Sequence, residues 1–219
     1  MTEQRLVVLI SGRGSNLRAI HQACTSGDLP AQIVGVISNR ANTLGLRWCQ
    51  ESHLPTQIIA HQDFPDREHF DHALAMAIDA YAPDWVLLAG FMRQLTEDFV
   101  ARYLGRLVNI HPSLLPAFPG LQTHQSALTA GVRWHGATVH FVTPELDAGP
   151  IIAQGIVPVL AGDNPETLAA RVLELEHTLY PQALRHLLRG DCRWENGQTL
   201  WRQPYRSPQM QAINPELLR

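Results

Sequence analysis

The chain has 219 residues, 45% of them hydrophobic and 17% charged, which excludes a disordered chain and allows a sizeable core. A formal net charge of -3 argues against a general nucleic-acid-binding protein, since such a protein needs a basic face. All 17 basic residues are Arg, so mechanisms that need a lysine amine are excluded: Walker-A phosphate binding, a pyridoxal Schiff base and a lysine-based aldolase.

The N-terminal segment and the cysteines indicate a cytoplasmic protein. The apolar run Leu6–Ile10 is too short for a signal-peptide core or a membrane span. Cys24, Cys49 and Cys192 are far apart, and the chain contains neither a C-x-x-C nor an H-E-x-x-H motif. We therefore expect free thiols in a reducing compartment, no bound metal and no membrane association.

Short β-rich runs alternate with longer amphipathic stretches, which predicts an α/β fold with a largely parallel sheet. The strongest helix lies within residues 66–83, where Phe70, Leu74 and Ile78 share a face and Pro83 follows the end. In the first half of the chain we expect strands at Leu6–Ser11, Ile33–Ser38, Thr56–Ile59 and Trp85–Ala89, with further helices at Leu17–Thr25 and Thr43–Ser52.

The second half continues the pattern and ends in a long helix. We expect strands at Leu107–Ile110, Ala137–Val142 and Ile151–Val159, and helices at Glu97–Tyr103, Thr123–Ala130 and Pro165–Leu188. Pro181 predicts a kink or break in the last helix, and Glu195–Gln198 predicts a hairpin turn. The fold class expected is a single-domain, Rossmann-like open twisted sheet of about seven mostly parallel strands with helices on both faces.

The loop Ser11–Asn16 lies between the first strand and the first helix. Glycines there let the backbone approach a ligand, and the N–H groups at a helix start favour an anion such as a phosphate. Leu17 occupies the third glycine position of the dinucleotide fingerprint, so the match to that motif is incomplete. A 2′-phosphate near Arg40, as in an NADP enzyme, and a plain capped turn remain alternatives.

The sharpest motif is Asn109–Pro116, with the sequence NIHPSLLP. Residues two apart on a strand face the same side, so Asn109 and His111 project together while Ile110 enters the core. They end a predicted strand, where ligands bind in open α/β sheets. Asn offers an uncharged donor for an oxyanion and His exchanges protons near neutral pH, so the pair predicts catalysis, with a structural histidine as the alternative.

Asp147 lies in a tight loop, LDAGP, between two apolar strands. A carboxylate there would orient His111 and favour its imidazolium form, although a turn-forming Asp before Gly-Pro is an equally good interpretation from the residues alone. His135 and His140 are five apart on or beside a strand, so we expect them to project differently and to be structural.

These motifs together resemble the phosphoribosylglycinamide formyltransferases, a branch of the folate-dependent formyltransferases. The resemblance extends in order from about Leu6 to Leu188, and NIHPSLLP followed by LD-x-GP is its most specific part. It is carried by Ser11–Asn16, Ala89–Arg93, Asn109–Pro116, Pro119–His124, His140–Val142 and Leu146–Pro150. The resemblance implies transfer of a formyl group from 10-formyltetrahydrofolate to the amine of glycinamide ribonucleotide, in purine synthesis, without a metal.

The resemblance also implies which residues bind and react. Asn109, His111 and Asp147 would be catalytic. The ribonucleotide would be bound by Gly12, Gly14, Ser15, Asn16 and Glu176, and the folate by Arg67, Met92, Arg93, Gln94, Leu95 and Asn109. Residues 1–219 would form one domain, with a phosphate-binding half at 1–105, a catalytic and folate-binding half at 106–190, and a tail at 191–219.

Three residues depart from the family pattern, namely Arg13, Gln94 and Ala148, which affects loop geometry rather than chemistry. Alternatives are a formyltetrahydrofolate hydrolase, a formyltransferase for another amine, and a non-catalytic nucleotide-binding module. We expect a monomer or homodimer whose partners are its small-molecule substrates.

Overall fold

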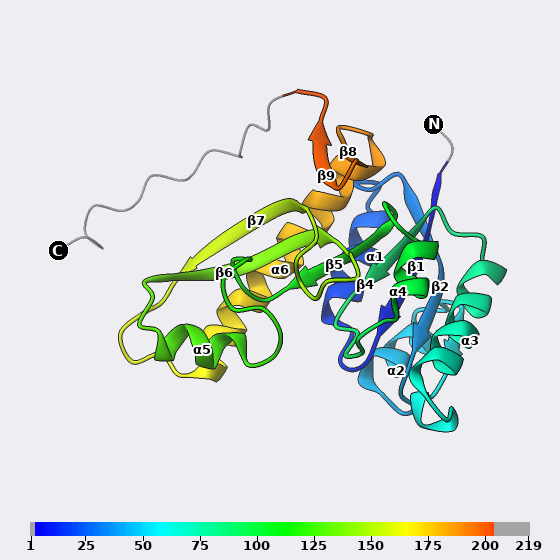
Figure 1. Ribbon diagram of the computed structural model, residues 1–219, viewed down its shortest axis with the longest axis horizontal. Coiled ribbons are helices and arrows are strands. Elements are labelled where there is room, and N and C mark those ends of the chain that lie inside the picture. The colour runs from blue at the N-terminus through cyan, green and yellow to red at the C-terminus, as the bar shows by residue number, and fades with distance from the viewer. Residues whose placement is uncertain (1–2, 204–219) are drawn as a thin grey trace.

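The computed structural model of the chain describes residues 3–203 and shows the expected alternation of strands and helices (Figure 1). Part of the expected C-terminal tail, residues 204–219, lies outside the described residues. In chain order the elements are β1 (Gln4–Ile10), α1 (Ser15–Thr25), β2 (Ala31–Ser38), α2 (Leu44–Glu51), β3 (Thr56–Ile58), the 3-10 turn η1 (His61–Asp63), α3 (Arg67–Ala80), β4 (Trp85–Leu88), α4 (Glu97–Arg102), β5 (Leu107–His111), α5 (Thr123–Thr129), β6 (Trp134–Phe141), β7 (Ile151–Pro158), α6 (Pro165–Leu188), β8 (Cys192–Glu195) and β9 (Gln198–Trp201).

A seven-stranded sheet runs through the molecule in the order β3-β2-β1-β4-β5-β6-β7. The first five strands pair in parallel, and β6 and β7 continue the sheet as antiparallel strands. The strand order reverses direction at β1, which lies between β2 and β4. In open α/β sheets ligands bind at such a switch point, outside the carboxyl ends of the strands. The expected α/β fold class is confirmed.

Two apolar cores cover the two faces of the sheet, because alternate residues of each strand point to opposite sides. In β1, Leu6 and Val8 face a core that includes residues of α1 and α6, whereas Val7 and Leu9 face a core that includes α3 and α4. The helices therefore lie on both faces, as the sequence predicted.

Two expectations about the helices are corrected by the structure. Helix α1 begins at Ser15 rather than Leu17, because Gly14 adopts a left-handed conformation (φ 70°) that starts the helix. Helix α6 is one helix of 24 residues through Pro181, so the chain does not break there, whereas the expected kink stays a prediction. Pro181 is buried in the tertiary structure, and its packing offsets the backbone hydrogen bond that proline cannot make.

The expected hairpin turn is confirmed between β8 and β9. Asn196 and Gly197 both have positive φ, 51° and 77°, as the tight turns that connect antiparallel strands require. Cys24, Cys49 and Cys192 are free thiols, and burial raises the pKa of each of them above its ordinary value.

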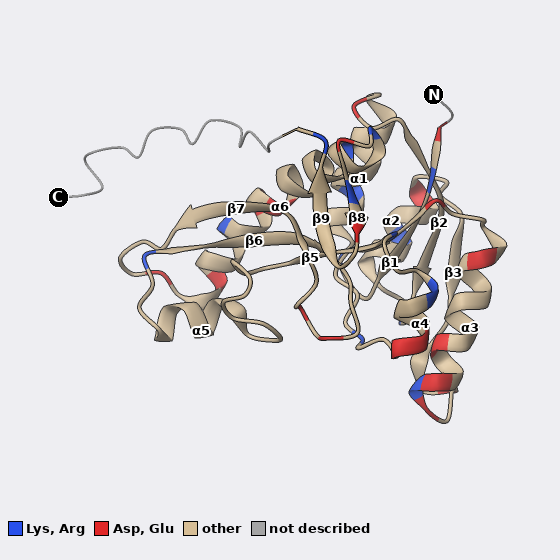
Figure 2. Ribbon diagram, turned by 45° about the horizontal axis from the view of Figure 1, so that its top comes forward, with Lys and Arg blue, Asp and Glu red and all other residues tan. Residues whose placement is uncertain are grey.

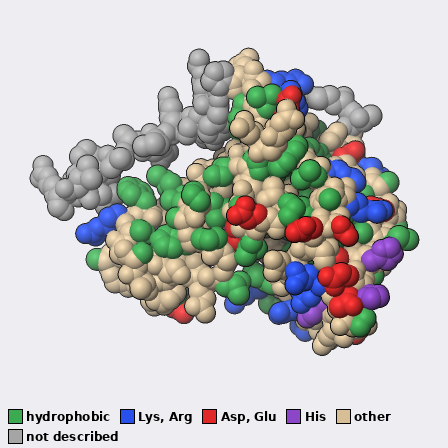
Figure 3. All heavy atoms as spheres, in the orientation of Figure 1, with side chains coloured by type: hydrophobic (Ala, Val, Ile, Leu, Met, Phe, Trp, Pro, Cys, Tyr) green, Lys and Arg blue, Asp and Glu red, His purple; other side chains and the backbone are tan. Residues whose placement is uncertain are grey.

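The surface carries no uniform charge. Figure 2 shows basic and acidic residues dispersed over the ribbon, with acidic residues frequent on α3 and α4. On the face shown in Figure 3, apolar side chains gather over β6 and β7, where Trp134, Ile151 and Ile156 are exposed. Among residues 3–203, none of the helices is both long and apolar enough to span a membrane.

Candidate functional site

The loop between β1 and α1 has the geometry of an anion site. Gly14 is the N-terminal cap of α1, and no side chain caps the helix, so its first N–H groups are left for a ligand. A side chain at Gly14 would bring a Cβ atom to 3.0 Å from the Cα of Gly45 in a left-handed conformation, which explains the glycine. The carbonyl of Gly12 accepts a hydrogen bond from the Gly45 backbone N–H at 3.0 Å, and this contact supports the loop.

Asn16 and Glu176 form a buried pair beneath this loop. Asn16 Nδ2 donates to Glu176 Oε2 at 2.6 Å, which joins the start of α1 to the middle of α6. The two residues are only 6% and 7% exposed. Burial raises the pKa of Glu176, and the hydrogen bond from Asn16 acts in the opposite direction. The sequence placed both residues at the ribonucleotide site, and the structure brings them into direct contact.

Ser11 connects the loop that is expected to bind phosphate, Ser11–Asn16, to the segment after β4. Its hydroxyl donates to Asn39 Oδ1 at 2.6 Å and accepts from the backbone N–H of Met92 at 2.7 Å. Ser11 also donates its own backbone N–H to the carbonyl of Gly90 at 3.1 Å. These hydrogen bonds join the start of the expected phosphate loop directly to the start of the expected folate segment.

Asn109 and His140 face each other across β5 and β6, where they are register partners. The ring Nδ1 of His140 lies 2.9 Å from the carbonyl of Phe141, which can only accept, so Nδ1 carries a proton. Burial lowers the pKa of His140 and favours the neutral ring. Nε2 then accepts from Asn109 Nδ2 at 3.3 Å, which orients the amide and leaves its second N–H for a ligand.

His111 and Asp147 come together from β5 and from the loop between β6 and β7. His111 Nδ1 lies 3.4 Å from Asp147 Oδ2, and both side chains are less than one tenth exposed. His111 Nε2 lies 3.0 Å from the carbonyl of Phe118, and Asp147 Oδ2 also accepts from the Gly120 backbone N–H at 2.8 Å. Both ring nitrogens of His111 thus face oxygen acceptors.

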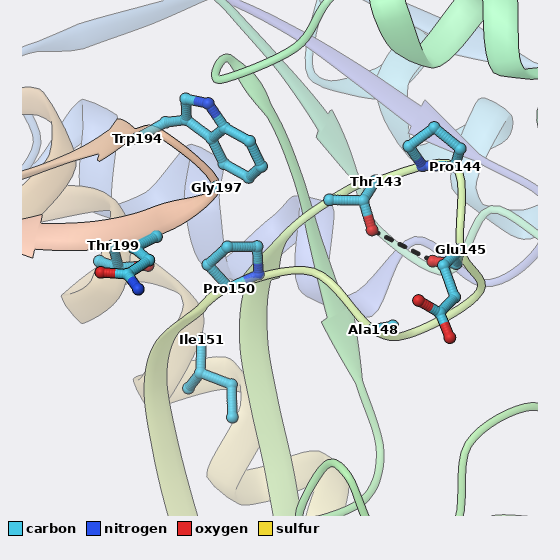
Figure 4. Close-up of a pocket in the computed structure, with 10 residues that line it drawn as sticks. Thr143, Pro144, Glu145, Ala148, Pro150, Ile151, Trp194, Gly197 and Thr199 are labelled. Atoms are coloured by element: carbon cyan, nitrogen blue, oxygen red, sulfur yellow. Dashed lines mark hydrogen bonds between the residues drawn. The ribbon is translucent and has the colours of Figure 1, made fainter.

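The loop that carries Asp147 is shaped by local contacts. Asp147 itself has a φ of 52°, in the left-handed region that Asp tolerates better than most residues. Figure 4 shows the Thr143 hydroxyl directed at the carbonyl of Glu145, to which it donates at 3.2 Å. On its outer side the loop borders an open groove, whose opposite wall is Trp194 and neighbouring residues of the β8–β9 hairpin (Figure 4).

On its inner side the same loop forms one wall of a cleft at the carboxyl ends of β4 and β5. Asn109, His140 and Asp147 line this cleft. So do three of the residues expected at the folate site, Arg93, Gln94 and Leu95. The lining is completed by Leu88, Phe91, Val100, Val142, Thr143, Pro144, Glu145 and Leu146.

The remaining expected folate residues lie outside the lining of this cleft. Met92 is 61% exposed and precedes Arg93 in the same segment. Arg67 is the first residue of α3 and is exposed to solvent. The structure therefore brings the cleft-lining residues together and places Arg67 and Met92 on the surface.

His140 is the site residue that sequence reasoning missed. The sequence predicted a structural role for it, whereas the structure places its ring between Asn109 and Asp147, whose Oδ1 lies 4.0 Å from His140 Nε2. If the strands of Asn109 and His140 are taken as an antiparallel pair, the two residues can lie opposite each other, and this pairing would have indicated a role for His140 beside Asn109. His135 does project elsewhere, as expected: it is fully buried against Phe118, and burial lowers its pKa to about 4.

The comparisons with known proteins define the class. The formyl transferase family model matches residues 4–184, so the chain belongs to the formyl transferase family. Within the described residues 3–203, no group of three or more His, Cys, Asp or Glu side chains is placed to hold a metal ion.

Within that family, the relatives of this chain point to one branch. It is 47% identical to the phosphoribosylglycinamide formyltransferase of Escherichia coli (strain K12), over 91% of this chain and 97% of that protein. It is 44% identical to the trifunctional purine biosynthetic protein adenosine-3 of Homo sapiens over 90% of this chain, and spans 20% of that protein. The phosphoribosylglycinamide formyltransferase structure from Coxiella burnetii has a TM-score of 0.86 and 48% identity, covering 91% of this chain and 93% of that one. The resemblance found in the sequence is confirmed.

Proposed function

We propose that this enzyme transfers the formyl group of 10-formyltetrahydrofolate to the amine of glycinamide ribonucleotide, giving formylglycinamide ribonucleotide and tetrahydrofolate in purine synthesis. The observation that carries the proposal is the connected group Asn109, His140, Asp147 and His111 at the cleft. Asn109 and His111 lie on β5, which is separated by one strand, β4, from β1, and β1 leads into the loop proposed to bind the phosphate. A formyl donor in the cleft and a phosphorylated amine at the loop would meet there.

The substrates would occupy the two ends of this site. The N–H groups at the start of α1, at Gly14, Ser15 and Asn16, would bind the phosphate of the ribonucleotide, with Gly12 supporting the loop. Glu176 would accept hydrogen bonds from the ribose hydroxyls. The folate would lie in the cleft against Arg93, Gln94 and Leu95, with Arg67 and Met92 at its mouth. The proposed halves at 1–105 and 106–190 would then share both ligands, because the folate residues 67 and 92–95 lie in the first half and Glu176 lies in the second.

The reaction would proceed through a tetrahedral intermediate. The substrate amine attacks the formyl carbon, a new C–N bond forms, and the carbonyl oxygen becomes an anion. The free N–H of Asn109 Nδ2 would donate to that oxygen, because His140 already holds the other N–H and fixes the amide. The protonated ring of His111 would supply a second donor.

Proton transfer completes the exchange. The attacking amine loses one proton, the bond between the formyl carbon and folate N10 breaks, and N10 gains one proton, so the charge balances. His111 would give its own proton to N10 and then take up the proton of the amine, through a water that Asp147 holds, so the ring ends in its starting state. For this, His111 Nε2 must exchange the Phe118 carbonyl for the substrate or the water. Holding the two substrates side by side supplies much of the acceleration.

Hydrolysis of formyltetrahydrofolate is the competing function, because the same side chains can direct water at the formyl group. The chain is 30% identical to a formyltetrahydrofolate deformylase from Pseudomonas syringae, with a TM-score of 0.83, and covers 66% of that chain. The higher identities to phosphoribosylglycinamide formyltransferases favour transfer to the amine. We further propose that the enzyme acts in the cytoplasm, as a monomer or homodimer.

A spectrophotometric assay tests the proposal. The purified protein is mixed with 10-formyltetrahydrofolate, with and without glycinamide ribonucleotide, and the loss of the formyl group is followed. Deformylation only in the presence of the ribonucleotide supports the transferase. Equal deformylation without it establishes a hydrolase, and no reaction in either mixture directs the search to other amine acceptors.

A further inference from the structure

The folate cleft is bounded by a segment without regular secondary structure, residues 91–96, between β4 and α4. In the part of the chain that the structure describes, two backbone N–H groups of this segment donate hydrogen bonds, those of Met92 and Thr96. Met92 donates to the hydroxyl of Ser11, and Thr96 donates to Asp71 Oδ2 at 2.6 Å. Since Arg93, Gln94 and Leu95 line the cleft, its wall depends on these two contacts.

Asp71 is an unusual residue for a helix core position. It lies on α3, is 2% exposed, and its second carboxylate oxygen has no hydrogen-bond partner among residues 3–203. A buried carboxylate with an unpaired oxygen costs stability, so a purely structural position would favour an apolar side chain. Burial raises the pKa of Asp71, and the Thr96 hydrogen bond and the positive charges of Arg67 and Arg93 act in the opposite direction.

Arg93, in the same segment, lines the cleft and packs against α3. Its guanidinium carbon lies 5.5 Å from the centre of the Phe70 ring, the residue next to Asp71 in α3. Its Nε is buried and has no hydrogen-bond partner in the described part of the chain. Arg93 is half-buried and lines the cleft, so its position depends on the same segment that Thr96 anchors to Asp71.

We propose that Asp71 is a positioning residue of the folate cleft: its carboxylate holds the backbone of Thr96, and with it the cleft wall. The proposal rests on the proposed function, because it takes the ligand of the cleft to be the folate donor. Displacing the wall by a fraction of an ångström would weaken donor binding, while the ribonucleotide site on the α1 side is left intact.

Asp79 offers a matched control on the same helix. Like Asp71, it joins α3 to the region of α4: Asp79 Oδ1 accepts from the Tyr103 hydroxyl at 2.8 Å, and Oδ2 pairs with Arg102. It does not belong to the lining of the cleft. Loss of Asp79 weakens the contact between the two helices without touching residues 91–96.

The experiment compares Asp71→Leu, Asp71→Asn and Asp79→Leu with the unaltered enzyme. We measure kcat and KM with each substrate varied in turn, and the melting temperature of each variant. Asp71→Leu should raise KM for 10-formyltetrahydrofolate about tenfold and leave KM for the ribonucleotide within about twofold. Asp71→Asn, which keeps an acceptor for Thr96 but loses the charge, should raise the donor KM by about threefold. Asp79→Leu should lower the melting temperature and leave both KM values unchanged.

An unchanged donor KM in a folded Asp71→Leu, or an equal rise in Asp79→Leu, would overturn the proposal. If Asp71→Leu does not fold, the test rests on Asp71→Asn. An unchanged KM for 10-formyltetrahydrofolate in Asp71→Asn would then overturn the positioning role of Asp71. Equilibrium titration with a 10-formyl folate analogue separates this proposal from the proposed function. An unaltered enzyme that binds the analogue but does not formylate the ribonucleotide refutes the function, and weaker binding in the Asp71 variants still supports the positioning role.

Discussion

Replacing Glu176 by Gln should stabilise the protein and weaken ribonucleotide binding. Glu176 is 7% exposed, and among residues 3–203 its side chain makes one hydrogen bond, accepted from Asn16 Nδ2. The amide oxygen of Asn16 has no hydrogen-bond partner within residues 3–203. A Gln side chain of the same size would accept from Asn16 with its oxygen and donate to the Asn16 oxygen with its nitrogen, and it would remove a buried charge.

The magnitude follows from the unpaired oxygen and the desolvated carboxylate. Leaving a buried acceptor unsatisfied costs about 1–3 kcal/mol, so we expect Glu176→Gln to raise the free energy of unfolding by about 1–2 kcal/mol at pH 7.5. For a chain of this size, that corresponds to a rise in melting temperature of roughly 2–8 °C. The same substitution should raise KM for the ribonucleotide about tenfold, because a neutral amide is a weaker acceptor than a carboxylate for the ribose hydroxyls.

The stability difference should also depend on pH. The pKa of Glu176 in the folded protein is raised above its ordinary value of 4.5, so the folded state binds this proton more tightly than the unfolded state. The contribution of Glu176 to stability is therefore fully present below about pH 4.5 and is lost as pH rises through the folded-state pKa. Glu176→Gln does not titrate, so its advantage should be smallest near pH 4.5 and should grow toward neutral pH.

Thermal unfolding between pH 4.5 and 8, followed by circular dichroism, measures this difference. Glu174→Gln, at an exposed position on the same helix, removes the same charge without burial and serves as the control. A melting temperature of Glu176→Gln below that of the unaltered protein at pH 7.5, or a difference that is constant with pH, would refute the reasoning about burial. An unchanged KM for the ribonucleotide would refute the role at the ribose.

Four further substitutions test other parts of the site and the fold. In steady-state assays, His111→Ala and Asp147→Asn should each lower kcat by about 10²–10⁴ with little effect on substrate binding, and an unchanged kcat in both would remove them from the reaction. His140→Ala should lower kcat about tenfold or more with little change in either KM, because Asn109 loses the ring that orients its amide; a change confined to KM would instead indicate a binding role. Tyr180→Phe should lower the melting temperature by roughly 2–8 °C in calorimetry, since the buried hydroxyl contacts the carbonyls of Leu88 and Val108 at 3.2 and 3.0 Å; an unchanged melting temperature would show that these carbonyls need no donor.

The sequence by itself determined the fold class and which residues of the strongest motif share a face of their strand. Side chains alternate between the two faces of β5 with a period of two, so residues on the same face can be assigned without coordinates. That reasoning placed Ile110 in the core, where it is 6% exposed, and Asn109 and His111 on the other side of β5. Local signals also predicted the hairpin turn at Asn196 and Gly197, because turn conformation depends on the turn residues themselves.

Only the tertiary structure decided which distant residues meet. The bond between Asn16 and Glu176 joins positions 160 residues apart, and it depends on how α6 lies against α1 on one face of the sheet. His140 reaches Asn109 because β6 pairs antiparallel to β5 in one register, and a slip of one residue would turn its side chain to the other face. Proline in α6 was likewise tolerated because surrounding contacts outweighed a local preference. Periodicity depends on residues that are close in the sequence and can be read from it. Strand register and helix packing depend on contacts between distant residues throughout the core, so they require the tertiary structure.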